Sequence, residues 1–99
     1  MHEVSVDQLK SAVEDQHGGT ATFLQSVPVK EVFGGKTVWE GVVHVFDLAG
    51  HPDAERAYAW STTLQWGNRR FYAVLHMGRV TGPVEAVRAA IVRERKRSG

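Results

Sequence analysis

The first apolar residues of the chain recur with the spacing of an amphipathic helix, at Val6, Leu9, Ala12 and Val13. Ser5 is a suitable N-cap for this helix, because Gln8 lies three residues later and completes a capping box. Gly18 follows as a stop signal, since glycine readily takes the left-handed conformation at a helix C-terminus. The pattern predicts a short helix between Ser5 and Gly18 with an acidic outer face.

Two segments rich in β-branched and aromatic residues follow, 20–33 and 37–48, and the loop Gly34-Gly35-Lys36 between them predicts a hairpin. Two strand registers are possible for this hairpin. A two-residue turn at Gly34-Gly35 puts Lys36 opposite Phe33, whereas a three-residue loop with a glycine bulge forms the pairs Lys30–Glu40, Val32–Val38 and Leu24–Phe46. We favour the second register, because it pairs opposite charges and apolar groups. Pro28 has no N–H for a ladder, which predicts an edge strand or a bulge there.

A second hairpin is predicted from 57–66 and 69–80, with a two-residue turn at Gly67-Asn68. Direct pairing across this turn segregates two faces. We expect a core face with the pairs Leu64–Phe71, Thr62–Ala73, Trp60–Leu75 and Tyr58–Met77. We expect a half-solvated face with the pairs Gln65–Arg70, Thr63–Tyr72, Ser61–Val74 and Ala59–His76. In the connection between the two hairpins, Pro52 is placed to open one helical turn within 50–56.

The last element is a predicted helix with Gly82 as N-cap and Pro83 at its first position. Its buried stripe comprises Val84, Val87 and Ile91, with Ala90 beside it. The order helix, four strands, helix predicts an α+β two-layer sandwich. We expect a four-stranded antiparallel meander in the order 1-2-3-4 with both helices packed on one face.

The length of 99 residues suits one domain, so we expect 1–99 to form a single core with a frayed basic tail from about residue 94. The chain has no cysteine, which excludes disulfides, thiolate metal sites and cysteine nucleophiles. No signal-peptide pattern opens the sequence, and no uncharged apolar run reaches about 20 residues. We expect a soluble cytoplasmic protein without a membrane segment.

Charge is divided along the chain. Residues 1–55 hold three basic and nine acidic side chains, a balance of −6, while residues 56–99 hold nine basic and two acidic ones, a balance of +7. If the two parts stay apart in the fold, one side offers a surface for anionic partners. The residues of this predicted basic binding surface are Arg69, Arg70, Tyr72, Arg79, Arg93, Arg95, Lys96 and Arg97. The basic residues also suit the negative end of the helix dipole, which explains the run at 93–97 but not the arginines before it.

The aromatic residues give little further evidence for a binding surface. Most of the rings fall on the predicted core face, which leaves Tyr72 on the solvated face and Trp66 at the hairpin end as candidates for base stacking. An exposed tyrosine on an antiparallel sheet is nevertheless ordinary.

An alternative site is suggested by residue types alone, namely His44, His51, Asp53 and His76. A hydrolase or a ligand-binding protein with such a site near the 49–56 loop is the rival hypothesis. The histidines lack metal-ligand spacing, and no nucleophile elbow or phosphate-binding glycine loop occurs. We therefore predict no catalytic residue, no metal and no cofactor.

The order of elements resembles that of the double-stranded RNA-binding domain, which has three strands between two helices. That family contacts phosphates with lysines at the start of its second helix. Here those positions read Pro83-Val84-Glu85-Ala86-Val87-Arg88, with an acid in place of the bases, and a fourth strand is present. Our prediction is a binding module without catalytic activity that acts through its basic surface. The expected partner is either a second copy of the chain, which would form a homodimer, or an anionic macromolecule such as RNA, DNA or an acidic protein.

Overall fold

The computed structural model describes residues 5–63, 67 and 69–98. Within these residues the chain forms one helix, four strands and a second helix. The strands make one antiparallel sheet in the order β1-β2-β3-β4, so the predicted α+β class and meander are confirmed. The elements are α1 (Val6–His17), β1 (Thr20–Phe33), β2 (Lys36–Ala49), β3 (Arg56–Thr63), β4 (Arg69–Leu75) and α2 (Pro83–Ser98).

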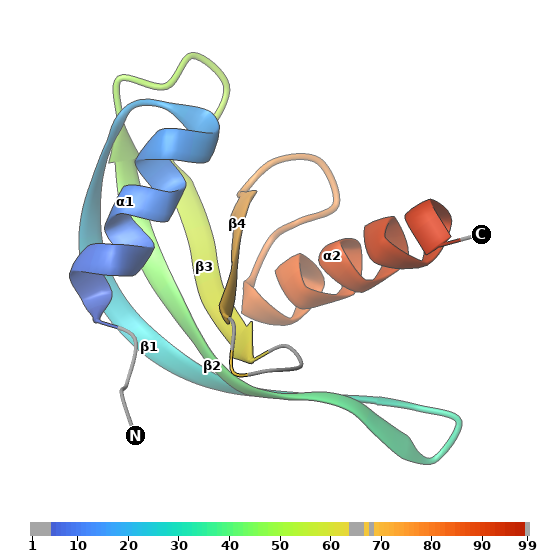
Figure 1. Ribbon diagram of the computed structural model, residues 1–99. Helices are drawn as coiled ribbons and strands as arrows, with labels where there is room; N and C mark the ends of the chain where they lie inside the picture. Colours follow the sequence, from blue (N-terminus) through green and yellow to red (C-terminus); the bar gives the residue numbers. More distant parts are fainter. Residues whose placement is uncertain (1–4, 64–66, 68, 99) are drawn as a thin grey trace.

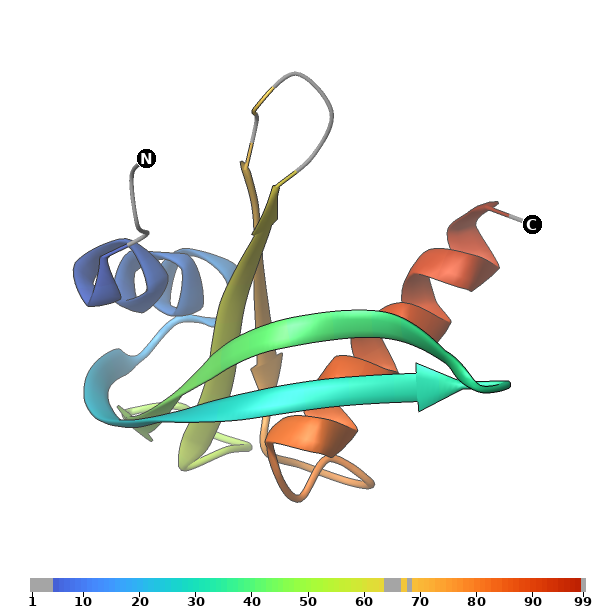
Figure 2. The ribbon, with the colours of Figure 1, turned by 90° about the horizontal axis from the view of Figure 1, so that it is seen from below.

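The two helices pack on opposite faces of the sheet, and not on one face as predicted. Successive side chains of a strand point to opposite faces. On β3, Ala57 and Ala59 join the hydrophobic cluster under α1, whereas Tyr58 and Trp60 join the cluster under α2. Figures 1 and 2 show α1 and α2 on either side of the β3–β4 hairpin, so this part of the sheet is the middle layer of the molecule.

Small side chains bring α1 close to the sheet. Leu9 and Val13 of α1 are fully buried against a layer formed mainly by Ala21, Ala57, Ala59 and Ala73, with Phe46 and Leu48 beside it. The predicted capping box of this helix is confirmed. The Ser5 hydroxyl accepts from the Gln8 N–H at 3.1 Å, and the Gln8 side chain accepts from the Ser5 N–H at 3.0 Å. The helix ends before Gly18 as predicted, but Gly18, with φ 83° and ψ −176°, does not take the expected left-handed helical conformation.

Side chains of α1 also bond to the backbone of both edge strands. Gln16 donates to the carbonyl of Phe71 at 3.4 Å, and His17 donates through Nε2 to the carbonyl of Ala73 at 2.7 Å. At the other edge, the Ala21 N–H donates to the Glu14 carboxylate at 2.9 Å. These bonds occupy backbone groups that an edge strand otherwise offers to another chain.

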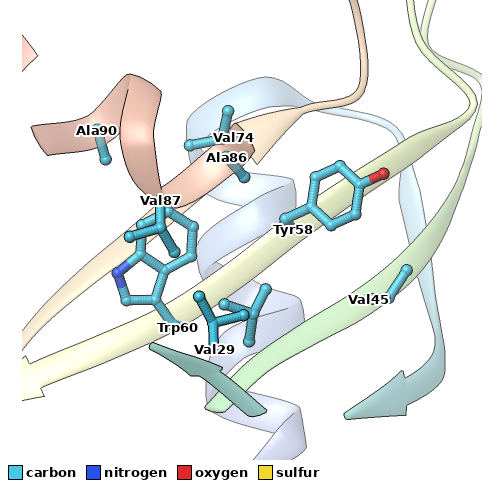
Figure 3. Close-up of a cluster of buried hydrophobic side chains, with 9 residues drawn as sticks. Val29, Val45, Tyr58, Trp60, Val74, Ala86, Val87 and Ala90 are labelled. Carbon is cyan, nitrogen blue, oxygen red and sulfur yellow. The ribbon is translucent and has the colours of Figure 1, made fainter. Parts of the chain in front are cut away.

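The second cluster lies between the other face of the sheet and α2 (Figure 3). Trp60 is 2% exposed and packs with Val87 and Ala90 of α2. The Gly82 carbonyl accepts from the Ala86 N–H at 3.0 Å, which confirms that the helix begins after Gly82. Figure 1 shows that the last turns of α2 extend away from the sheet.

The first hairpin contains both registers that the sequence left open. Gly34 and Gly35 have φ values of 60° and 79°, as a two-residue type I′ turn requires, and Phe33 lies opposite Lys36. Val38 is then skipped in the pairing, so Lys30 faces Glu40 as we favoured. The predicted pair Val32–Val38 is wrong, because Val38 has no partner on β1 and Val32 lies opposite Thr37. A second irregularity at Leu24 shifts the register back, so the predicted pair Leu24–Phe46 is wrong as well. Pro28 lies on an edge strand, as predicted.

The register predicted for the second hairpin is wrong by three residues. Trp60 lies opposite Tyr72 and Tyr58 opposite Val74. The last pair before the connecting loop is Thr63 with Arg69. An odd shift moves every side chain of one strand to the other face. The prediction assumed one solvated face, whereas this register gives apolar residues to both faces, each covered by a helix. The predictions for Leu64, Gln65, Trp66 and Asn68 lie outside the described residues.

The connection between β2 and β3 is not the predicted helical turn. The N–H groups of Asp53 and Ala54 donate to Nδ1 of His51, at 3.0 and 3.1 Å. The Leu48 N–H donates to the Glu55 carbonyl at 2.8 Å, which closes the loop. The imidazole of His51 thus accepts from backbone N–H groups that would donate to backbone carbonyls in a helix.

Candidate functional site

An apolar groove lies between α2 and the outer part of the β1–β2 hairpin. It consists of two adjacent cavities of about 360 and 410 Å³, which share Val38 and Ile91. Large apolar side chains at its outer end are exposed, with exposed fractions of 68% for Phe33, 51% for Val92 and 38% for Val38. The inner cavity is lined by Val38, Trp39, Trp60, Thr62, Tyr72, Val87, Ala90 and Ile91, and the outer one by Glu31, Val32, Phe33, Val38, Arg88, Ile91 and Val92.

The irregular pairing at Val38 shapes one wall of this groove. In a regular strand Val38 and Trp39 would point to opposite faces, but both line the inner cavity. A bulge redirects side chains in this way. Gly41 makes room for the indole, since a Cβ there would lie 2.8 Å from Cζ2 of Trp39.

The aromatic floor of the groove is already packed. Trp60 and Tyr72 are stacked with ring centroids 5.4 Å apart and planes at 11°, and Arg70 lies over the Tyr72 ring at 5.4 Å. Tyr72 is therefore half-buried against Trp60, and is not the solvent-facing ring that the sequence predicted. The pairing change in the second hairpin is the cause.

An ion pair joins the two walls. Arg88 on α2 donates through Nε to Glu31 on β1 at 2.9 Å. Glu31 is buried while Arg88 is exposed, so the arginine supplies a partner for a carboxylate that would otherwise lose its hydration. The contact fixes α2 relative to the hairpin.

The residues of the predicted basic surface do not all lie together. Arg69 and Arg70 begin β4, whereas Arg79 follows the other end of this strand, which spans about 20 Å. Arg93, Arg95, Lys96 and Arg97 belong to the last turns of α2. Arg70 lies over the ring of Tyr72, which lines the groove; Arg88 lines the outer cavity and Lys36 lies opposite Phe33, although neither of these two was predicted. The groove thus has a cationic rim formed by Lys36, Arg70 and Arg88.

Of the alternative site, three residues come together and one does not. His51, Asp53 and His76 line a polar cavity of about 490 Å³ with Asp47, Glu55 and Arg56. The Tyr58 hydroxyl and Nδ1 of His76 are 2.5 Å apart. Burial raises the pKa of Tyr58, with Arg56 opposing the shift. Nδ1 of His51 accepts from the N–H groups of Asp53 and Ala54, which leaves Nε2 as the ring nitrogen that could contact a ligand.

His44 lies away from this cavity, on the α1 face of the sheet. Its Nδ1 is 2.9 Å from the Ser26 hydroxyl, and its ring is 6.1 Å from that of Phe23. Burial holds the pKa of His44 below its ordinary value of 6.5. We therefore assign His44 to the structure of the sheet and not to a site.

The lowered pKa of His44 predicts a pH dependence of stability. Because the unfolded chain binds the proton more readily than the folded chain, the free energy of unfolding should be highest above pH 6.5 and should fall as the pH decreases through the folded-state pKa. Urea unfolding at several pH values between neutral and mildly acidic conditions measures this. In His44→Gln the decrease should become shallower, and an unchanged slope in the variant would contradict the assignment.

Two sequence signals pointed toward the groove but were not used. Val92 follows Ile91 and lies outside the predicted buried stripe of α2, which marks it as an exposed apolar residue on a basic helix. Val32 and Phe33 end a strand directly at the hairpin turn, where a core is seldom present. The bulge at Val38 has no such signal.

Among the described residues, no group of three or more His, Asp and Glu side chains is arranged to hold a metal ion. Neither helix, as far as the structure describes it, has the length and apolar character needed to cross a membrane. Comparison with protein-family models, with curated proteins and with solved structures found no match to this chain.

Proposed function

We propose that this chain is an interaction module without catalytic activity, and that its contact surface is the groove between α2 and the β1–β2 hairpin. The observation that carries the proposal is the exposure of Val32, Phe33, Val38 and Val92 along one groove. Scattered exposed apolar side chains are normal, but a continuous apolar patch with a polar rim is typical of a binding site.

The cationic rim gives the groove its preference for charge. Lys36 lies opposite Phe33, Arg70 lies over the Tyr72 ring, and Arg88 lines the outer cavity. The carboxylate among the lining residues, Glu31, is already bonded to Arg88. The surface therefore suits a partner that carries both apolar groups and negative charge.

The polar cavity supports the rival function less well. Its carboxylates belong to Asp47, Asp53 and Glu55, which are all exposed, so a bound ligand would compete with water at each of them. Its two imidazoles direct Nδ1 to groups of the protein itself. We therefore prefer the groove to a hydrolase or ligand site at the 49–56 loop.

Binding of anilinonaphthalene sulfonate (ANS), which is both apolar and anionic, tests the proposal. The folded protein should enhance the fluorescence of ANS, and Val38→Glu should weaken ANS binding about tenfold, because the substitution puts a like charge into the groove. Leu24→Glu is a matched control, since Leu24 is 43% exposed against 38% for Val38 and does not line the groove.

Circular dichroism verifies that both variants are folded. Equal loss of ANS binding in the two variants would mean that the dye binds exposed apolar surface in general and not the groove. Loss in the Leu24 variant alone would place the contact surface elsewhere. Either result would overturn the proposed function.

A further inference from the structure

We infer that the groove takes one extended segment of another protein, which adds as a strand to the free edge of β2 between Lys36 and Val43. This inference rests on the proposed function and deepens it by naming the kind of partner. Three features of the sheet support it: backbone groups of β2 that β3 leaves unpaired, the protection of the two outer strands, and the cavity beside the free edge.

The two hairpins separate along part of the sheet. β2 pairs with β1 over most of its length, but among the described residues it pairs with β3 only from His44 to Asp47. The part of β2 from Lys36 to Val43 therefore has one unpaired edge. Figure 2 shows β3 turning away from β2, which continues into the outer part of the hairpin. At about 3.3 Å per residue, this edge is about 26 Å long.

Glu40 and Val42 present the hydrogen-bonding groups of this edge. In an antiparallel sheet, every second residue of a strand directs its N–H and C=O to the same neighbour. The Leu48 N–H donates to the Glu55 carbonyl, on the side of β3. Pairing is regular from Leu48 back to Glu40, so alternate residues down to Val42 and Glu40 face this same side. A partner strand can bond to both of them without breaking a pair of the sheet.

The two outer strands are less suited to such pairing. On β4, the carbonyls of Phe71 and Ala73 accept from side chains of α1. On β1, the Ala21 N–H already donates to a side chain of α1, the pairing is irregular at Leu24, and Pro28 has no N–H. Such features keep edge strands from joining other chains. Among the described residues, the stretch of β2 between its bulge and its pairing with β3 has none of them.

The cavity beside the free edge supplies contacts for side chains of the partner. Residues directly opposite in paired strands point to the same face. A partner residue opposite Gly41 would therefore lie on the face of Trp39 and Trp60, beside the inner cavity of about 360 Å³. Val42 points to the other face and is 45% exposed, so it offers an apolar contact to the next partner residue. β-branched residues suit such a strand.

A second copy of the chain fits less well. A symmetric pairing of two β2 edges about Gly41 would put Lys36 of one copy opposite Phe46 of the other, because the two strands run in opposite directions. Phe46 is already paired with Ala57, so β3 blocks the incoming hairpin. A pairing centred nearer the turn would meet the bulge. A single segment that ends or turns beside β3 avoids both obstacles, and sedimentation over a range of concentrations should show a monomer.

Nuclear magnetic resonance with a synthetic peptide tests the inference. The peptide alternates valine and threonine over about eight residues, the length of the free edge, and carries two glutamates at each end to suit the cationic rim. It should shift the amide signals of Glu40 and Val42. Hydrogen exchange of these two amides should slow about tenfold, because each becomes a hydrogen-bond donor.

N-methylation of the peptide shows whether its backbone is bonded. One derivative carries methyl groups on every second residue, and the other carries them on the residues between. Each derivative lacks the N–H groups of one edge of the peptide, and only one edge faces β2. One derivative should therefore lose affinity about tenfold or more, while the other should bind as the unmodified peptide does.

Val42→Pro removes a donor on the protein side. The N–H of Val42 faces away from β1, so the hairpin keeps its own hydrogen bonds. The variant should bind the peptide about tenfold more weakly than the wild type. Val42→Ala is the matched control, since it keeps the N–H and should bind within about threefold of the wild type. Circular dichroism verifies the fold of both, and if Val42→Pro does not fold, the methylated peptides decide.

Several results would overturn the inference. Loss of binding in both methylated peptides, or in neither, would exclude a strand added by one edge, and unchanged binding to a folded Val42→Pro would place the contact elsewhere. An oligothymidylate that shifts the same amides more strongly would favour nucleic acid, and a concentration-dependent dimer would favour self-association. If no peptide binds but ANS binding still depends on Val38, the inference fails while the proposed function stands.

Discussion

Replacing Trp60 by alanine should lower the free energy of unfolding by about 3–5 kcal/mol, because a large buried side chain is removed and a cavity is left. Trp60 is 2% exposed, stacks on Tyr72 and contacts the ring of Trp39 at 6.0 Å between centroids. A small domain has a total stability of about 5–15 kcal/mol, so the variant should be close to unfolding. Urea denaturation monitored by circular dichroism measures the loss.

The position of the loss is as informative as its size. Because Trp60 faces α2, amide exchange should accelerate more at Val87 and Ala90 than at Leu9 and Val13 on the other face. Trp60→Phe is the matched control, since it keeps an aromatic ring against Tyr72 and should lose less. A loss below about 1 kcal/mol in Trp60→Ala would contradict the core position of this residue.

Replacing Ala59 by leucine should destabilise the opposite face by about 1–3 kcal/mol, because the site has no room for additional carbons. Ala59 is fully buried between the sheet and α1, and Ala73 lies directly opposite on β4. The larger side chain should push α1 outward and break the hydrogen bond from His17 to the Ala73 carbonyl. Urea denaturation measures the stability, and the ring signals of His17 report the displacement.

Ser61→Leu is the control for this prediction. Ser61 lies two residues further along β3 on the same face, but it is only half-buried. Its substitution should cost much less than that of Ala59. Equal stability of the Ala59 variant and the wild type would show that α1 does not pack tightly on the alanine layer.

Local signals predicted the elements of the fold well. Ser5 with Gln8 marked the start of α1, and Gly82 with Pro83 marked the start of α2, because capping depends on residues close in sequence. Short connections were sufficient to predict the meander. The pairing of Trp60 with Tyr72 was missed, because register depends on which faces become covered, and the sequence pattern was interpreted with one covered face.

The candidate site was predictable only in part. Arg70 was singled out by charge, and it lies over the ring of Tyr72 in the groove. The groove itself depends on the bulge at Val38 and on the side of the sheet that α2 takes. Neither is determined locally, since both follow from packing between segments that are distant in the chain.

The hydrogen bonds from Gln16 and His17 to Phe71 and Ala73 span more than half of the polypeptide. During synthesis α1 leaves the ribosome long before the Phe71 and Ala73 carbonyls have been made. Its apolar face therefore stays incompletely covered until β4 has been translated. Nascent chains halted ahead of that strand should therefore be the species that chaperones retain.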